Sequence, residues 1–229
     1  NSVKKLFYKI IYSMSDVIIV NSLEFKKDLK KTLKLNCVKI FNPIKIKNFN
    51  KTKKIDYFKN FNGIKILSIG RLTDQKNHIT ILKSLNILKK NKINFRFYLI
   101  GAGFKLNQLK QYVKNQKLSA YVKFAGYRVN AQEYIQSSDL FVLSSKSEGL
   151  PNVLIEAQLQ NVPILSSDCR TGPREILLNG KLGHLFKVDD YIELSQLIIN
   201  FSKDKKKFLY KAKLAKKYLY RFNFEKNLN

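Results

Sequence analysis

The sequence predicts an α/β protein built on a doubly wound parallel sheet. From Gly63 onward, short apolar runs that suit buried strands alternate with amphipathic stretches at helical spacing. The 229-residue chain is long enough to bury a sizeable core, and 45% of its residues are hydrophobic. Strand–helix alternation of this kind favours a parallel sheet with helices on both faces.

The regular part of the pattern covers residues 63–203, which we expect to form one domain, followed by a helical segment over 204–229. The predicted strands are Ile64–Ile69, Phe95–Ile100, Val122–Ala125, Leu140–Leu143 and Pro163–Ser166. The predicted helices cover about 75–91, 104–116, 131–137 and 151–161.

The first 42 residues show the same alternation, with too few strands to make a domain. The predicted elements are a helix over 2–14, a strand Asp16–Val20, a helix capped by Ser22 that runs to Leu33, and a strand Val38–Phe41. We expect residues 1–42 to be the end of a second α/β unit whose beginning is absent. Residues 43–62, rich in Lys and Asn, are predicted to be a linker.

The helix over 2–14 is basic and amphipathic, so it could touch a membrane or pack on a sheet. Packing is favoured, because a predicted strand follows at once. The net charge of +28, from 44 Lys and Arg against 16 Asp and Glu, also suits a nucleic-acid or membrane-surface binder without catalysis.

The lysines are spread along the whole chain, with no zinc-finger spacing and no RNP-like segment. This distribution favours a solvated face over a nucleic-acid interface, so we expect no nucleic-acid partner. We expect a minority of the lysines to contact anionic lipid headgroups.

Cys37 and Cys169 have no metal-ligand spacing and are typical of reduced cytosolic thiols. His78 and His184 lack the partners of a metal site or a catalytic triad, so we expect both to be structural or exposed. No uninterrupted apolar stretch is long enough to span a bilayer. We expect a cytoplasmic protein that lies peripherally on the inner face of the cell membrane.

The most informative segment is Ser147–Ala157, where Glu148 and Glu156 flank the predicted start of a helix. Pro151 suits the first turn, where its missing N–H would be unpaired in any case. The free N–H groups of a helix N-terminus favour phosphate or sugar oxygens. The alternative is that both glutamates only favour the helix dipole or the solvated surface.

Two further segments follow predicted strands. Gly70 ends the first strand and permits close backbone approach, while Arg71 and Lys76 in the next loop could bind phosphate oxygens. Gly101 and Gly103 resemble the start of a dinucleotide fingerprint whose third glycine is replaced by Leu106, which disfavours hydride chemistry with NAD.

The remaining junctions have less specific patterns. Gly126, Tyr127 and Arg128 follow a strand and suit either contact with a nucleotide base or an ordinary turn. The segment 171–176 is a further anion-binding turn or merely a stiff connection. No Asp-x-Asp pair for Mg²⁺ occurs.

Taken in order, these motifs resemble the signature of family-4 retaining glycosyltransferases of the GT-B fold, of a type that builds bacterial surface glycans and lipopolysaccharide. The matching motifs are Gly-Arg-Leu with Lys at 70–76, Gly-x-Gly at 101–103, Phe-x-Gly-Tyr at 124–127, Ser-x-x-Glu-Gly-Leu-Pro at 145–151, the Glu pair at 148 and 156, and Gly-Pro-Arg-Glu at 172–175. The resemblance covers roughly residues 16–225.

The resemblance implies a Rossmann-like donor domain over 63–203 and an acceptor-side remnant over 1–42. It implies catalytic roles for Arg71, Lys76 and Glu148, with the two cations neutralising a diphosphate and Glu148 contacting the transferred sugar. It implies a donor-binding set of Gly70, Gly101, Gly103, Gly126, Tyr127, Arg128, Gly149, Leu150, Pro151, Asn152, Val153 and Glu156, in which Glu156 binds the ribose hydroxyls.

The implied reaction is retaining transfer of a hexosyl group from a UDP- or GDP-sugar to a glycan or lipid-linked acceptor, without a metal or other cofactor. Because most of the acceptor-side domain is absent from this chain, we expect mainly the donor-binding half, which binds donor and can be inactive by itself. A GT-B nucleotide-sugar epimerase is the alternative enzyme.

Overall fold

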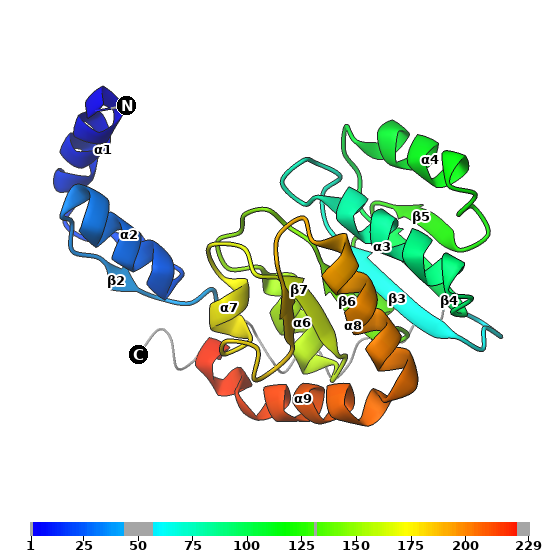
Figure 1. Ribbon diagram of the computed structural model, residues 1–229. Coiled ribbons are helices and arrows are strands. Elements are labelled where there is room, and N and C mark those ends of the chain that lie inside the picture. Colours follow the sequence, from blue (N-terminus) through cyan, green and yellow to red (C-terminus); the bar gives the residue numbers. More distant parts are fainter. Residues whose placement is uncertain (1, 44–56, 131, 224–229) are drawn as a thin grey trace.

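The computed structural model describes residues 2–43, 57–130 and 132–223. Its main unit is a six-stranded parallel sheet with the order β5-β4-β3-β6-β7-β8 and helices on both faces (Figure 1). From β3 the chain winds outward through β4 to β5, and then crosses to the other side of β3 for the last three strands. This doubly wound arrangement confirms the fold class that the strand–helix alternation predicts.

The strands of the main sheet agree closely with the predicted apolar runs. They are β3 (Ile64–Ile69), β4 (Phe95–Ile100), β5 (Val122–Gly126), β6 (Leu140–Leu143), β7 (Ile164–Ser167) and β8 (His184–Phe186). The predicted bounds of β3, β4 and β6 are confirmed, while β7 begins and ends one residue later than predicted. The sequence analysis missed β8, since three residues are too few to show a strand pattern.

The helices of the main unit are shorter than the apolar patterns predict. They are α3 (His78–Lys90), α4 (Leu106–Asn115), α5 (Gln132–Ile135), α6 (Asn152–Leu159), α7 (Pro173–Ile176), α8 (Tyr191–Lys203) and α9 (Lys205–Lys217), followed by the 3-10 helix η2 (Leu219–Phe222). α3 begins at His78 because Asn77 adopts a left-handed conformation with φ of 53°. The sequence analysis did not identify α8.

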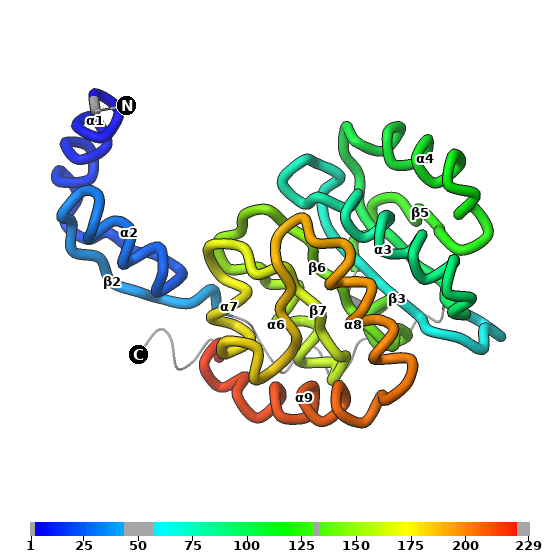
Figure 2. Tube along the Cα trace, viewed as in Figure 1, coloured from blue at the N-terminus to red at the C-terminus, as the bar shows by residue number. Residues whose placement is uncertain are grey.

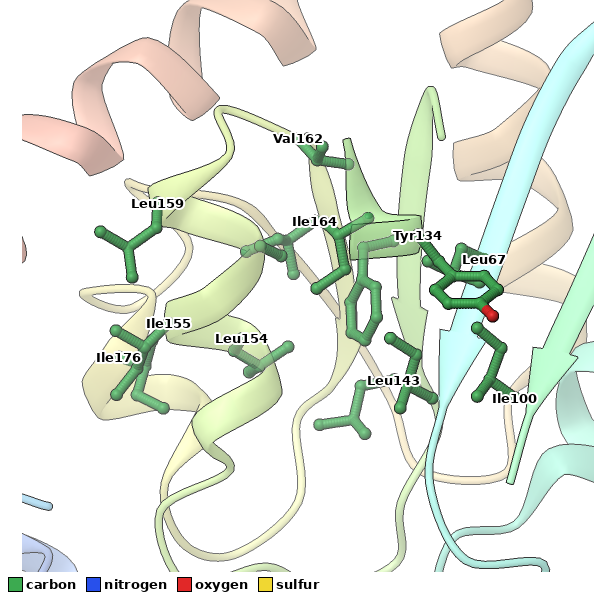
Figure 3. Close-up of a cluster of buried hydrophobic side chains, with 14 of the residues drawn as sticks. Leu67, Ile100, Tyr134, Leu143, Leu154, Ile155, Leu159, Val162, Ile164 and Ile176 are labelled. Atoms are coloured by element: carbon green, nitrogen blue, oxygen red, sulfur yellow. The ribbon is translucent and has the colours of Figure 1, made fainter. Parts of the chain in front are cut away.

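The sheet is buried on both faces, with alternate strand residues pointing to opposite sides. Ile64 and Ile66 belong to the core beneath α3, α4 and α8. Leu67 and Ile69 belong to the second core, where α5, α6, α7 and η2 cover the sheet. Figure 3 shows part of this second core, with Leu154 on α6 packed toward the strands.

The N-terminal residues form a small separate unit next to α7 (Figure 2). It consists of α1 (Ser2–Ser13), β1 (Ile19–Val20), α2 (Leu23–Leu33) and β2 (Val38–Lys39), with β1 and β2 paired in parallel. The Ser22 hydroxyl accepts the Phe25 N–H at 3.2 Å, which confirms the predicted cap of α2. Both strands are shorter than predicted.

The apolar side chains of α1 are exposed, including Leu6, Phe7, Ile10 and Ile11. The favoured expectation that this helix packs on a sheet is therefore wrong for this structure, in which α1 contacts α2. Within the described ranges, no helix combines the length and the apolar character needed to cross a membrane.

The end of the predicted linker contacts the main core, whereas residues 44–56 lie outside the described residues. Phe58 is 1% exposed and its ring centroid lies 4.5 Å from that of Tyr98 on β4. It belongs to the same buried cluster as Phe41 from the N-terminal unit. One aromatic cluster therefore joins the first unit, this segment and the main sheet.

We predict that Phe58→Ala lowers the free energy of unfolding by about 3–5 kcal/mol, because it leaves a cavity in a close-packed core. Urea unfolding followed by circular dichroism measures the change. The control is Phe104→Ala, since Phe104 is 73% exposed, and its expected cost is below about 0.5 kcal/mol. Equal losses in the two variants would show that Phe58 is not part of the core.

A second prediction concerns acid stability. Burial, together with the nearby Lys76 charge, lowers the pKa of His78 from 6.5 to about 3. The unfolded chain therefore binds this proton first as the pH falls. Stability is complete above about pH 6.5 and declines toward pH 3 by up to about 1.4 kcal/mol per pH unit. Burial also lowers the pKa of His184, to about 4. Its protonation therefore also lowers the stability of the fold as the pH falls.

Urea unfolding at about pH 7.5 and about pH 5 tests this for wild type and His78→Gln. The stability lost between the two pH values should be smaller in the variant by about 2 kcal/mol. An identical pH dependence in both proteins would mean that the pKa of His78 is the same in the folded and unfolded states.

Candidate functional site

The carboxyl ends of β3 and β6 lie next to each other at one edge of the sheet. The two strands are neighbours, yet the chain leaves them toward opposite sides of the sheet. Doubly wound proteins bind ligands at such a switch point. The segment after β3 contains Gly70, Arg71 and Lys76, and the segment after β6 contains Glu148, so the topology brings these predicted site residues to the same edge.

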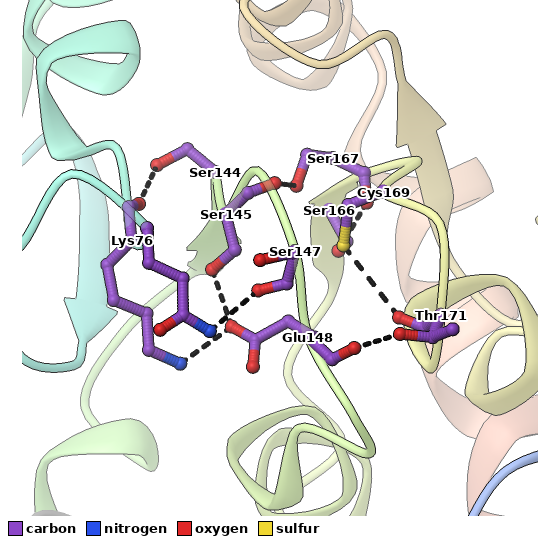
Figure 4. Close-up of polar contacts among 10 residues, drawn as sticks. Lys76, Ser144, Ser145, Ser147, Glu148, Ser166, Ser167, Cys169 and Thr171 are labelled. Carbon is purple, nitrogen blue, oxygen red and sulfur yellow. Dashed lines mark hydrogen bonds and ion pairs between the residues drawn. The ribbon is translucent and has the colours of Figure 1, made fainter. Parts of the chain in front are cut away.

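Lys76 and Glu148 form an ion pair between the segments that follow these two strands. The Lys76 Nζ lies 2.6 Å from Glu148 Oε1, and the side chains are only 15% and 8% exposed (Figure 4). The Ser145 hydroxyl donates to the same oxygen at 2.6 Å. Two donors therefore hold one oxygen of a nearly buried carboxylate.

Hydrogen bonds join the loops that contain the ion pair. The Ser144 hydroxyl lies 3.0 Å from the carbonyl oxygens of both Lys76 and Asn77. Asn77 Nδ2 donates to the Ser144 carbonyl at 3.2 Å, and Gln75 Nε2 donates to the Ser147 carbonyl at 2.9 Å. These hydrogen bonds hold the segments around Lys76 and Glu148 in place relative to each other.

The segment after β7 supports the Glu148 loop from the other side. The Ser167 hydroxyl donates to the Ser145 carbonyl at 2.6 Å, and the Thr171 hydroxyl donates to the Glu148 carbonyl (Figure 4). Cys169 is buried between these contacts. Burial, reinforced by the Glu148 charge, raises its pKa to about 11, so the thiol stays protonated and unreactive at neutral pH.

Close backbone approach explains two of the glycines. A Cβ on Gly101, which has φ of +148°, would lie 1.9 Å from the Gly70 carbonyl oxygen. A Cβ on Gly172 would lie 2.2 Å from the Gly149 carbonyl oxygen. Only glycine fits at either position, and both contacts pack neighbouring loops of the site together.

The start of α6 faces the same edge with uncapped N–H groups. Pro151 is the N-cap residue, and its side chain makes no capping hydrogen bond. Leu150 is buried and Asn152 is exposed, so the first anchors the turn and the second presents polar atoms to solvent. The N–H groups of Asn152 and Val153 at this helix N-terminus favour an anionic or hydroxyl ligand.

Arg71 and Glu156 have not been brought into the ion-pair network. Arg71 is exposed in the loop after β3, and Glu156 is half-buried on α6. Burial raises the pKa of the Glu156 carboxyl above its usual value. Within the described part of the chain, neither side chain makes a hydrogen bond or ion pair, so the structure leaves both free to bind a ligand.

The predicted base-binding residues lie further along the edge. Gly126 ends β5, two strands away from β3, and Tyr127 and Arg128 after it are exposed. The Arg128 guanidinium donates to the Tyr127 carbonyl at 3.3 Å. Gly103 packs against the backbone of Leu72, where a Cβ would lie 2.4 Å from the Leu72 carbonyl oxygen.

The sequence analysis missed two residues of the N-terminal unit that reach this edge. Asn42 Nδ2 donates to Asn152 Oδ1 at 3.1 Å. A Cβ on Gly149 would lie 3.5 Å from Asn21 Nδ2. Neither asparagine has a sequence signal of its own, because each follows a very short strand far from α6 in the chain.

The Gly-Pro-Arg-Glu turn contacts the N-terminal unit through Glu175. Glu175 Oε2 accepts the Leu23 N–H at the start of α2 at 2.8 Å, and Lys39 lies 3.6 Å from Glu175 Oε1. The carboxylate therefore satisfies the positive end of a helix in the N-terminal unit. This turn connects the two units of the structure.

The fold and the site at this sheet edge define an α/β domain of the kind that makes up GT-B proteins. The family described as "Glycosyl transferases group 1" matches residues 49–218. This match covers well over half of the chain, which belongs to the glycosyl transferases group 1 family.

Relatives of this chain are glycosyltransferases that are longer than it is. An uncharacterized glycosyltransferase of Methanocaldococcus jannaschii is 33% identical over 180 residues, which are 75% of this chain and 44% of that protein. The N-acetylgalactosamine-N,N'-diacetylbacillosaminyl-diphospho-undecaprenol 4-alpha-N-acetylgalactosaminyltransferase of Campylobacter jejuni is 27% identical over 207 residues, 89% of this chain and 55% of that protein. The chain spans about half the length of these curated relatives.

Solved structures agree on the fold. A glycosyltransferase from Rickettsia africae has a TM-score of 0.85 at 20% identity, covering all of this chain and 66% of that one. Alr3699/HepE from Anabaena in complex with UDP has a TM-score of 0.80 at 20% identity, covering 91% and 60%. Both likenesses support the GT-B assignment of the fold.

We predict strong energetic coupling between Lys76 and Glu148. Removing either partner leaves the other as a nearly buried charge without compensation. The stability lost in the double alanine variant should therefore be smaller than the sum of the losses in the two single variants. A double-mutant cycle on urea unfolding should give a coupling free energy of about 1–3 kcal/mol.

The matched control is the Lys105–Asp74 pair, which has a similar distance of 2.7 Å but a 72% exposed carboxylate. Its cycle should give less than about 0.5 kcal/mol because water screens an exposed pair. Equal coupling in the two cycles would contradict a special role for the Lys76–Glu148 pair.

Proposed function

We propose that this chain is the donor-binding part of an enzyme that transfers a sugar, with retention, from a nucleotide-diphosphate sugar to a glycan or lipid-linked acceptor. The ion pair between Lys76 and Glu148 at the switch point is the observation that carries the proposal. In a chain of the glycosyl transferases group 1 family, a nearly buried cation and carboxylate in contact at the sheet edge support a site for a diphosphate and its sugar.

In this proposal, Arg71 and Lys76 bind the diphosphate and neutralise the charge that develops as it leaves. The N–H groups at the start of α6 add hydrogen bonds to phosphate or sugar oxygens. Their combined effect stabilises the leaving group electrostatically, which requires donors aimed in advance at the developing charge. In this proposal, Arg71 and Lys76 supply the positive charge that a metal ion would otherwise provide. Because they contact the diphosphate and not the base, either a UDP- or a GDP-sugar could be the donor.

The nucleoside and the sugar would bind on either side of the diphosphate. Glu156, half-buried and without a partner among the described residues, suits a pair of ribose hydroxyls. Gly126, Tyr127 and Arg128 would bind the base. The backbones at Gly101 and Gly103 would lie along the nucleotide between the base and the diphosphate. Glu148 would contact the transferred sugar.

The transfer step follows from this placement. The bond between the anomeric carbon and the diphosphate oxygen breaks, and an acceptor hydroxyl oxygen bonds to that carbon on the same face. The hydroxyl proton goes to the departing diphosphate. The chain contributes by positioning the reactants and stabilising the leaving charge.

The acceptor is proposed from the relatives and from the charge of the chain. The name of the Campylobacter jejuni relative specifies a diphospho-undecaprenol acceptor, which is a lipid. A chain with a net charge of +28 would be attracted to an anionic membrane surface, where such an acceptor lies. We therefore propose a glycan or lipid-linked acceptor and a peripheral position on the inner face of the membrane.

Calorimetry with UDP- and GDP-sugars tests donor binding. Arg71→Ala and Glu156→Ala should each weaken binding of the preferred donor about tenfold or more, since each removes a charge-assisted hydrogen bond to the ligand. Unchanged affinity in both variants would refute the assignment of the site.

The controls remove the same chemical groups elsewhere. Arg96 stacks on the Phe61 ring at 4.6 Å near the start of β4, at the opposite edge of the sheet. Glu193 accepts the Lys187 N–H at the start of α8. Arg96→Ala and Glu193→Ala should leave donor affinity unchanged.

A further inference from the structure

We propose that Ser145 is a positioning residue for Glu148: its hydroxyl holds one carboxylate oxygen so that the other stays available to the donor sugar. This inference rests on the proposed function, in which Glu148 contacts the transferred sugar. The sequence identifies Ser145 only as the first residue of a motif, without a role.

The direction of the hydrogen bond is set by chemistry. A carboxylate paired with Lys76 only accepts, so the Ser145 hydroxyl is the donor in its 2.6 Å contact with Glu148 Oε1. The Lys76 ammonium donates to that same oxygen. Among the described residues, nothing donates to Oε2, which Figure 4 shows without a dashed line.

Ser145 is itself rigidly placed. It is fully buried two residues after the end of β6, and its carbonyl accepts the Ser167 hydroxyl of β7 at 2.6 Å. Its neighbour Ser144 is bonded to the carbonyl of Lys76. The Ser145 hydroxyl therefore cannot follow a moving carboxylate, and instead defines where Oε1 must lie.

The arrival of a diphosphate makes this contact more important. The Lys76 ammonium donates to Glu148 Oε1 at 2.6 Å. A bound phosphate oxygen would compete with Oε1 for the same ammonium. Ser145 then remains the donor that keeps the carboxylate in its orientation, because a neutral hydroxyl attracts a phosphate less strongly than the Lys76 ammonium does.

Because Lys76 binds the diphosphate and Glu148 contacts the sugar, loss of the Ser145 hydroxyl should affect the two kinds of ligand differently. A nucleoside diphosphate without sugar needs Lys76 but has no sugar for Glu148 to contact. A nucleotide sugar needs both. Loss of the Ser145 hydroxyl should therefore weaken binding of the nucleotide sugar and spare the nucleoside diphosphate.

The experiment compares two dissociation constants by calorimetry on the full chain. The probes are UDP-glucose with UDP, and GDP-mannose with GDP, using the pair that wild type binds. In Ser145→Ala, the dissociation constant for the nucleotide sugar should rise about tenfold, as expected for a lost hydrogen bond to a charged group. The value for the nucleoside diphosphate should stay within about twofold.

Two further variants separate positioning from packing. Ser145→Cys keeps nearly the same volume and has only a weak donor, so it should behave like the alanine variant even if Ser145→Ala folds poorly. Ser166→Ala removes an equally buried hydroxyl that bonds to the Ser167 carbonyl at 3.1 Å. It should leave both dissociation constants unchanged.

The outcomes distinguish this inference from the proposed function. Equal weakening of both ligands in the Ser145 variants would show a structural role, and no weakening of either would show that the hydroxyl is dispensable. Either result would overturn the inference about Ser145 and leave the proposed function intact. A wild-type chain that binds neither pair would overturn the proposed function, and the inference with it.

Discussion

The carboxylate of Glu148 is almost completely removed from water, and the geometry of the site depends on how that charge is compensated. Burying a charge costs several kcal/mol unless it is paired and hydrogen-bonded. Lys76 and Ser145 meet this requirement at one oxygen, from two different loops. Because the ion pair joins the segment after β3 to the segment after β6, it holds the two sides of the switch point together.

The backbone around this pair is equally constrained. Gly101 lies against Gly70, and Gly172 lies against Gly149, so neighbouring loops at the carboxyl edge pack with no room for a side chain. Glu175 extends this packing to the N-terminal unit by binding the Leu23 N–H. The first unit therefore rests on the same turn that supports the Glu148 loop, which places Asn42 beside the start of α6.

The apolar pattern predicted the centre of the sheet well and its margins less well. β3, β4 and β6 are buried along most of their length, so their sequences are mainly apolar, and only Lys65, Ser68 and Arg96 interrupt the pattern. β8 contains three residues at an edge of the sheet, where no such run is required. In the N-terminal unit, the periodicity of α1 correctly predicted a helix, but its exposed apolar side chains show that periodicity does not specify what a helix packs against.

Residue types and their order along the chain were enough to predict an α/β fold and a cation and a carboxylate at one edge of its sheet, because strand burial and charge chemistry are local properties. Folding decided which of those groups touch. The Lys76–Glu148 contact joins residues 72 positions apart, and Ser145 and Glu175 gained their partners only when separate loops met. Contacts of this kind depend on distances in space that no local pattern encodes, so the sequence could name the charged residues of the site but not the hydroxyl that holds them.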